Sequence, residues 1–236
     1  QGAPAAYDWL ALYAQDEAGY QNLCALVSAA HLARPVEEQA HVDFERLSRH
    51  ADGLICLTAG GEGAIAKLLA DRQQAAADAY ADRLIALFPD RLYVEISRRG
   101  DAVETAAEPH LIAMADGRGL PLVATNPACY ADADFHRAHD IMLCIAASTY
   151  VESDDRTKSN PDAWIKPAHD MRALFADLPD ALENTLVVAQ RCAVAAPSRK
   201  PILPSLAGDR EAETEQLRRD ARAGLIDRLL KTSSPS

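Results

Sequence analysis

The sequence of 236 residues has little positive charge and lacks a strand that combines basic with aromatic residues. Its 24 Lys and Arg residues are outnumbered by 35 Asp and Glu residues, which gives a formal net charge of −11. A protein that grips nucleic acid regardless of sequence needs surplus cations to neutralise phosphates. Single-strand binding also relies on aromatic platforms beside basic residues. We therefore expect that this chain does not bind DNA directly.

Other features that the sequence lacks indicate where in the cell the protein is located. The chain has no C-x-x-C pair, no apolar run close to the roughly 20 residues needed to cross a bilayer, and no secretory signal at its start. Scattered cysteines of this kind are typical of reduced thiols, mostly packed as small hydrophobic residues. They are Cys24, Cys56, Cys129, Cys144 and Cys192. We expect a cytoplasmic protein with no membrane partner.

The middle of the chain alternates between strand and helix patterns. Short apolar runs at 53–58, 91–96 and 119–125 are typical of strands. Helical patterns at 75–88 and 104–117 separate them. Long connections between strands that are apolar on both faces favour parallel pairing. This region predicts an α/β fold, although the pattern by itself fits a barrel and an open sheet equally well.

Helical patterns flank the α/β region. They cover, in order, residues 8–32, 132–147, 169–175 and 179–193. A connector at 195–204 contains three prolines, and an amphipathic helix begins at Asp209. We therefore expect a domain boundary between Leu203 and Gly208.

The densest cluster of titratable residues lies at 132–140. On a helix, His136, His139 and Asp140 share a face and could hold a divalent metal. The alternative is an acidic helix start followed by exposed histidines, since Asp132 and Asp134 suit the positive end of the helix dipole. The spacing favours the helix start and leaves the metal site open.

Three features stand near the carboxyl ends of predicted strands, where parallel α/β proteins form their sites. The turn Gly60–Gly63 could cradle a phosphate or be only a tight turn, which we favour. Cys129 is either a reactive thiol or soft ligand, or a buried thiol. Glu95 inside a strand predicts a structural ion pair with Arg98 or Arg99 rather than a general base.

Several segments together follow a known pattern. They are Tyr13–Leu23 (YAQDEAGYQNL), 53–61 (GLICLTAGG), Leu92–Ile96 (LYVEI), 119–126 (GLPLVATN), 174–185 (LFADLPDALENT) with Arg191 and Cys192, and 202–204 (ILP). In content and order these segments resemble the alpha subunits of bacterial DNA polymerase III, the C-family replicative polymerases. The resemblance covers nearly the whole chain.

The resemblance implies a partial PHP (polymerase and histidinol phosphatase) domain over residues 1–205, a distorted β/α barrel that lacks its N-terminal strands. Residues 206–236 would then be the linker and first helix of the palm region. DNA-directed DNA synthesis, the nucleotidyltransferase activity and the palm magnesium would belong to the parent polymerase. We expect no catalytic residue in this fragment, and self-association as a consequence of an incomplete barrel.

The resemblance also identifies degenerate metal-site positions. Trp9 stands where metal-binding members carry His, Gly60 where they carry Cys, and Pro127 and Cys129 where they carry Asp and His. Gly and Pro offer no side-chain ligand, and Trp does not bind these metals. We therefore expect no metal or other cofactor at this site.

Two functions follow from the resemblance. The first is a metal-free scaffold that docks the proofreading exonuclease subunit, other replicase subunits and the rest of the polymerase chain. The alternative is a surviving metal-dependent phosphoesterase or exonuclease that uses His136, His139 and Asp140.

Overall fold

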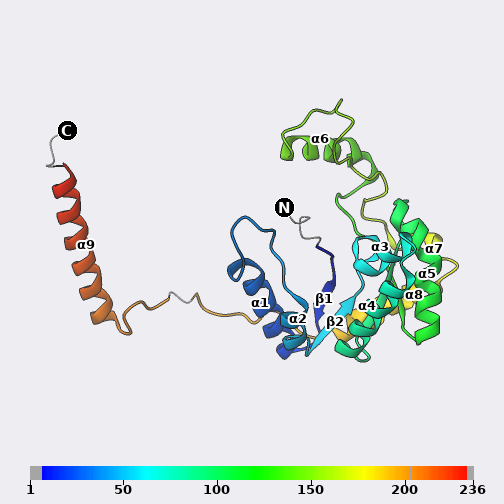
Figure 1. The fold of residues 1–236 in the computed structure, drawn as a ribbon, viewed down its shortest axis with the longest axis horizontal. Helices are drawn as coiled ribbons and strands as arrows, with labels where there is room; N and C mark the ends of the chain where they lie inside the picture. Colours follow the sequence, from blue (N-terminus) through cyan, green and yellow to red (C-terminus); the bar gives the residue numbers. More distant parts are fainter. Residues whose placement is uncertain (1–6, 202–203, 233–236) are drawn as a thin grey trace. The chain divides into compact units, whose positions relative to one another are not determined.

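The computed structural model describes residues 7–201 and 204–232. The chain divides into two compact units, residues 1–195 and 196–236. The first unit is an α/β domain built on a four-stranded mixed sheet with the order β1-β2-β3-β4 (Figure 1). The strands are β1 (Ala11–Ala14), β2 (Leu54–Leu57), β3 (Leu92–Ser97) and β4 (Leu122–Thr125).

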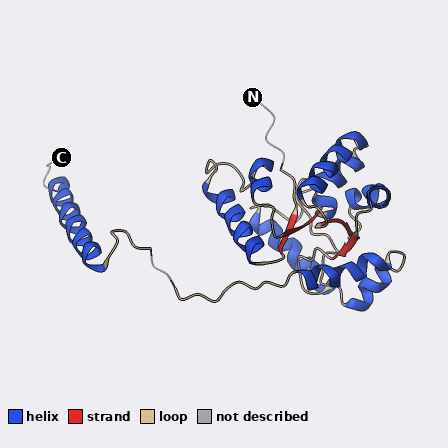
Figure 2. Ribbon diagram, turned by 90° about the horizontal axis from the view of Figure 1, so that it is seen from below, coloured by secondary structure: helices blue, strands red, loops and turns tan. Residues whose placement is uncertain are grey.

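Helices surround these strands (Figure 2). In chain order they are α1 (Glu17–Leu32), α2 (Phe44–Arg49), α3 (Ala64–Ala70), α4 (Gln74–Leu87), α5 (Ala102–Arg118), α6 (His136–Ala146), α7 (Ala168–Leu174) and α8 (Pro179–Arg191). Two 3-10 turns, η1 (Gly60–Glu62) and η2 (Ala133–Phe135), follow β2 and precede α6. The predicted helices at 75–88, 104–117, 132–147, 169–175 and 179–193 are confirmed within a few residues.

The predicted parallel strands are confirmed as β2, β3 and β4. Leu57 pairs with Tyr93 and Ser97 pairs with Thr125, both in parallel register. The strand predicted at 119–125 begins later, at Leu122, because Gly119 adopts a positive φ of 64° to end α5.

The helix expected over 8–32 is wrong in its first part, because residues 11–14 form a strand. Ala11 pairs with Leu57 and Ala14 with Leu54, so β1 lies antiparallel at the edge of β2. Asp16 then caps α1 by accepting a hydrogen bond of 2.8 Å from the backbone nitrogen of Gly19. Pairing with β2 satisfies backbone groups that a longer helix would otherwise satisfy, so tertiary contacts override the local helical pattern.

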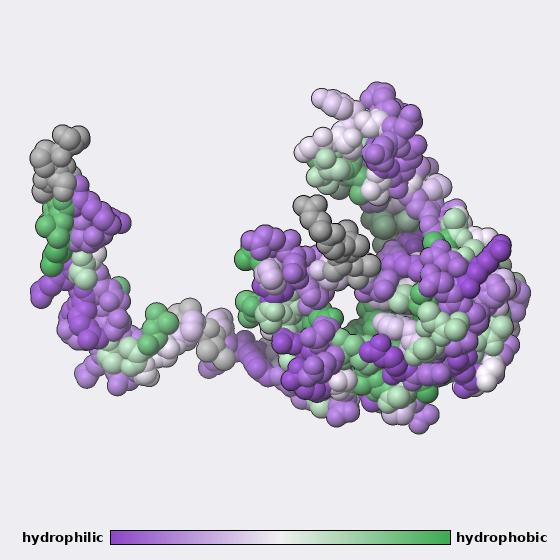
Figure 3. Space-filling view, in the orientation of Figure 1, coloured by the Kyte–Doolittle hydropathy of each residue, from purple (hydrophilic) through white to green (hydrophobic). Residues whose placement is uncertain are grey.

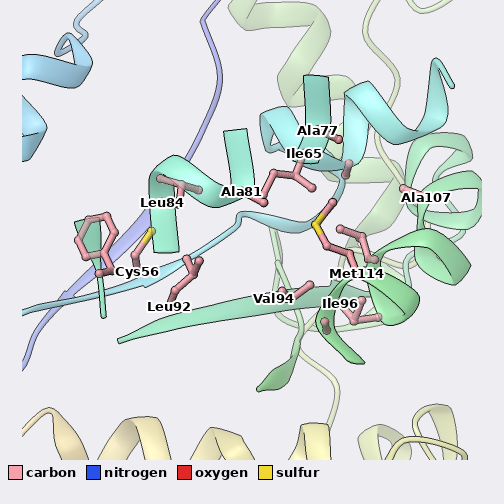
Figure 4. Close-up of a cluster of buried hydrophobic side chains, with 14 of the residues drawn as sticks. Cys56, Ile65, Ala77, Ala81, Leu84, Leu92, Val94, Ile96, Ala107 and Met114 are labelled. Carbon is pink, nitrogen blue, oxygen red and sulfur yellow. The ribbon is translucent and has the colours of Figure 1, made fainter. Parts of the chain in front are cut away.

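The sheet separates two hydrophobic clusters. On one face, Cys56, Val94 and Ile96 pack with Leu84 of α4 and Met114 of α5 (Figure 4). On the other face, a smaller cluster joins the sheet to Val188 of α8; its strand members are Ile55, Leu57, Tyr93 and Val123. Both faces are therefore covered, which explains why the parallel strands read as apolar runs.

The expectation that most cysteines are packed as hydrophobic residues is confirmed for three of the five. Cys56 and Cys144 are buried and Cys192 is half-buried, but Cys24 and Cys129 are exposed. Cys56 lies inside the central sheet, whereas Cys24 lies on the outer side of α1 and Cys129 lies on a loop after β4. The strand position shields the thiol of Cys56, because both faces of the sheet are covered.

The second unit contains α9 (Arg210–Thr232). Its assignment to a palm region stays a prediction, and Ile202 and Leu203 of the exit motif lie outside the described residues. Across the described ranges, every helix is either too short or too polar to cross a membrane.

Candidate functional site at the carboxyl edge of the sheet

The four degenerate positions lie at one end of the sheet. Gly60 follows β2, and Pro127 and Cys129 follow β4, which runs parallel to β3 and β2. Trp9 enters β1 from the same end, because Ala11 pairs with Leu57 at the close of β2. Its ring is 56% exposed and helps to line a groove of about 540 Å³ beside α1, α2 and α4.

A buried ion pair occupies the middle of this edge. Arg99 donates from Nε and Nη2 to Oε1 of Glu104, at 2.9 and 2.7 Å. The backbone nitrogen of Arg99 donates to Oε2 at 2.8 Å, and Ser97 Oγ donates to Oε1 at 2.8 Å. Glu104 is only 4% exposed. Its charge is tolerated because both oxygens are hydrogen-bonded and a cation is adjacent.

Arg99 also connects the three turns of the edge. Its Nη1 lies 3.5 Å from the carbonyl oxygen of Pro127, after β4, and its Nη2 lies 3.7 Å from a carboxylate oxygen of Glu62, after β2. Its own carbonyl accepts a hydrogen bond of 3.1 Å from Nδ2 of Asn160. A fixed guanidinium charge therefore lies among the turns that carry Gly60, Pro127 and Cys129.

The glycines after β2 allow this close packing. A Cβ atom on Gly60 would lie 2.6 Å from Ser97 Oγ, and one on Gly61 would lie 2.7 Å from Glu104 Cγ. Gly60 also has a positive φ of 49°, which disfavours any other residue. The backbone nitrogens of Glu62 and Gly63 donate back to Ala59 O at 3.0 and 3.2 Å. These amides are already bonded within the turn, which fits a tight turn better than a phosphate cradle.

Glu95 lies on β3, two residues before Ser97. Its Oε1 accepts a hydrogen bond of 2.6 Å from Thr125 Oγ1. Its Oε2 is buried and has no hydrogen-bond partner among the described residues. Burial raises the pKa of this carboxyl above its usual value, and the nearby Glu62 adds to the effect, while the hydrogen bond from Thr125 opposes it.

The predicted ion pair between Glu95 and Arg98 or Arg99 is wrong. Arg98 donates instead to Glu108 and Asp177, each at 2.6 Å, and Arg99 donates to Glu104. Both arginines follow the end of β3 and meet carboxylates on α5 and on the α7–α8 turn. Glu95 shares the sheet face of Tyr93, which is opposite to the face on which α5 packs.

The cluster on α6 is brought together, but by contacts with a loop of the same chain. His136 Nε2 lies 3.1 Å from Ser159 O, and His139 Nδ1 lies 2.7 Å from Ser159 Oγ. Asp140 accepts two hydrogen bonds of 2.8 Å from Arg156, which hold its pKa far below the usual range. Within the described ranges, no group of three or more His, Cys, Asp or Glu side chains is arranged to hold a metal ion.

The helix-start interpretation of this cluster is partly right. Asp132 accepts a hydrogen bond of 3.2 Å from the backbone nitrogen of Phe135 and so caps η2. The histidines, however, are half-buried rather than exposed. Of the two alternatives for Cys129, the buried thiol is wrong, because that residue is exposed.

The sequence reasoning missed Glu104, Ser97 and the role of Arg99. One signal was available for Glu104: Asp101 and Glu104 have the spacing of an N-cap and its third helical residue. Asp101 Oδ1 indeed accepts from the backbone nitrogens of Val103 and Glu104, at 2.8 and 3.3 Å. The pairing of Glu104 with Arg99 depends on how α5 packs against β3 and had no local signal.

Comparison with known proteins defines the class. Residues 4–99 match the family model described as PHP domain. These residues include β1, β2, β3 and the turn at Gly60, so much of the candidate site lies within a PHP domain.

The relatives are more specific. Over 229 residues the chain is 43% identical to DNA polymerase III subunit alpha of Caulobacter vibrioides, covering 96% of this chain and 20% of that protein. The corresponding protein of Rickettsia bellii is 39% identical over 218 residues (92% of this chain, 19% of that protein), and that of Vibrio cholerae is 32% identical over 221 residues (93% and 19%). The chain therefore carries a PHP domain and is a relative of the DNA polymerase III alpha subunits. It spans about a fifth of the length of these curated relatives.

Proposed function

We propose that this chain is a metal-free PHP scaffold of a replicative DNA polymerase. In this proposal the polymerase as a whole synthesises DNA in the cytoplasm with magnesium in its palm region. The present chain contributes no catalytic group and instead holds the proofreading exonuclease and other replicase subunits.

The observation that supports the metal-free role is the guanidinium of Arg99 at the carboxyl edge. It already supplies a positive charge to Glu104 and approaches the turns at Glu62 and Pro127. A divalent cation in the same place would have to displace this guanidinium from its buried carboxylate partner. Gly60 adds a second obstacle, because a ligand side chain there would crowd Ser97 Oγ and would need a positive φ.

Metal analysis tests this role. We expect the purified protein to contain no stoichiometric metal and to show the same melting temperature with added Mn²⁺, added Zn²⁺ or EDTA. We also expect no hydrolysis of a phosphodiester substrate. Stoichiometric metal with turnover that His139→Ala abolishes would instead support the alternative phosphoesterase.

Arg99→Met tests the ion pair that stands at this edge. The substitution leaves the charge of Glu104 buried without its partner, and breaking such a pair costs about 3–5 kcal/mol of stability. Urea denaturation measures the loss. The matched control is Arg34→Met, on a half-buried side chain that donates only to backbone carbonyls near the end of α1; a loss no larger than in this control would contradict the role of Arg99.

Docking is tested separately with the proofreading exonuclease subunit of the same organism. We expect co-purification of that subunit with the PHP-containing protein, at salt concentrations where neither binds DNA. If neither this chain nor the whole polymerase retains the exonuclease, the docking role is wrong.

A further inference from the structure

Helix α6 has its polar and apolar faces reversed relative to an ordinary surface helix. The side chains that contact the rest of the chain are His136, His139 and Asp140, through Ser159 and Arg156. Three of its large apolar side chains face outward. Ile141 is 40% exposed, Met142 is 55% exposed and Ile145 is 72% exposed.

These three residues form one stripe, because positions three and four apart lie on the same side of a helix. The turn after the helix extends the apolar surface with Tyr150 and Val151, which are 78% and 48% exposed. We call this surface, Ile141, Met142, Ile145, Tyr150 and Val151, the α6 stripe.

The α6 stripe lies on a part of the first unit that projects from the body. Figure 1 shows α6 and its loops apart from the sheet and the helices that cover it. In the space-filling view, hydrophobic side chains are visible in this projecting region beside hydrophilic ones (Figure 3). A group of exposed apolar side chains on one helix and the turn after it is typical of an interaction site.

Polar contacts with the loop after it fix the orientation of the helix. Asp140 and Arg156 form a two-pronged ion pair, with both bonds at 2.8 Å, and Ser159 N donates to Asp140 Oδ1 at 2.9 Å. Cys144, on the inward side, is buried. The polar contacts of α6 therefore turn its polar face toward the rest of the chain and leave the α6 stripe exposed.

Charge around the stripe indicates the kind of partner. Exposed carboxylates stand before the helix, at Asp132 and Asp134, and after it, at Glu152, Asp154 and Asp155. The exposed cations of the same segment are Arg137 and Lys158. The surface is therefore apolar in its middle and predominantly acidic at both ends.

We propose that the α6 stripe docks a segment of another protein that carries an apolar ridge flanked by Lys or Arg residues. A second copy of this chain fits less well, because pairing two stripes would bring two acidic rims together in molecules of net charge −11. The proposal rests on the proposed function in one respect: the partner is sought among the replicase subunits.

Charge-selective substitution tests the proposal in the whole protein that carries this sequence, reconstituted with its replicase subunits. Ile145→Lys and Ile145→Glu should leave the melting temperature unchanged because Ile145 is exposed. Ile145→Lys should weaken assembly by about tenfold or more, since it removes a central apolar contact and repels basic flanks. Ile145→Glu should weaken assembly less, and Val36→Lys, at a side chain that is 90% exposed on a different loop, is the matched control.

Photo-crosslinking identifies what contacts the stripe. A benzophenone amino acid at position 145 should crosslink to another subunit, at a peptide with apolar and basic residues, whereas the same probe at position 36 should not. Crosslinks within the same chain, crosslinks to a second copy, or no crosslink above the control would each overturn the proposal. Absence of exonuclease docking in the wild-type protein counts against the proposed function, while normal assembly of both Ile145 variants counts only against the α6 stripe.

Discussion

At the scale of single residues, two buried carboxylates near the carboxyl edge have opposite environments. Glu104 is bonded by Arg99, Ser97 and a backbone amide, so its charge is compensated. Glu95 receives a hydrogen bond from Thr125 at one oxygen, and its other oxygen is buried without a partner among the described residues. The first stabilises the edge, and the second makes it less stable whenever Glu95 is ionised.

Glu95→Gln should therefore stabilise the protein by about 1 kcal/mol at neutral pH, because it removes a buried charge and keeps an acceptor for Thr125. The raised pKa of Glu95 fixes the direction of the pH dependence. As pH rises above the usual glutamate value, the unfolded state ionises first, so stability falls until pH exceeds the raised folded-state pKa. Below the usual value, both states are protonated and the carboxyl has no effect.

Urea denaturation of the wild type and Glu95→Gln between acidic and neutral pH measures this effect. The variant should gain its advantage progressively as pH rises. Glu104→Gln is the matched control, since it weakens a compensated pair and should destabilise the protein at neutral pH. Equal losses in the two variants would show that Glu95 also depends on its charge.

At the scale of elements, the close contact between α1 and the start of β2 sets the position of the edge strand. A Cβ atom on Gly19 would lie 1.9 Å from the carbonyl oxygen of Gly53, which itself has a positive φ of 68°. The same carbonyl accepts a hydrogen bond of 2.8 Å from the backbone nitrogen of Gln15, between β1 and α1. Both sides of this contact are backbone, which cannot move aside as a flexible side chain can.

Gly19→Ala should cost about 3 kcal/mol or more, because the added methyl group overpacks against backbone. Gly117→Ala is a suitable comparison: it lies in the exposed last turn of α5 with open space around its Cβ position, and should gain about 0.5–1 kcal/mol. Thermal melting of the two variants checks both directions. A neutral Gly19→Ala would mean that α1 moves freely relative to β2.

At the scale of the whole molecule, acidic residues outnumber basic ones, and several of the arginines form ion pairs within the chain. Arg98, Arg99 and Arg156 each bind carboxylates of the same chain. They are therefore engaged within the protein rather than presented to phosphates. These three arginines are therefore not available to neutralise DNA phosphates.

Fluorescence anisotropy with labelled duplex DNA checks this conclusion. At physiological salt we expect no saturable binding, because a chain of net charge −11 has too few free cations to release counterions from DNA. A titration at low salt serves as the control for weak, non-specific contact. Tight binding with a steep salt dependence would contradict the expectation.

The sequence predicted the parallel strands well because β2, β3 and β4 are covered on both faces and so appear as continuous apolar runs. It also predicted most helices, since their periodic apolar positions are local features. It missed β1, whose four residues are a strand only because β2 offers them a pairing edge. It likewise missed the partners of Glu95, Arg98 and Arg99, which come from α5 and from residues far along the chain.

Residue identity alone was enough to recognise the family and to show that Gly60 and Pro127 offer no side-chain ligand, because those inferences need only the order and chemistry of residues. Tertiary structure alone decided which charges compensate one another at the carboxyl edge. It also decided that the polar face of α6 turns inward and its apolar face outward. Both depend on which distant segments pack together, since a carboxylate or a helix face acquires its environment from its neighbours in space.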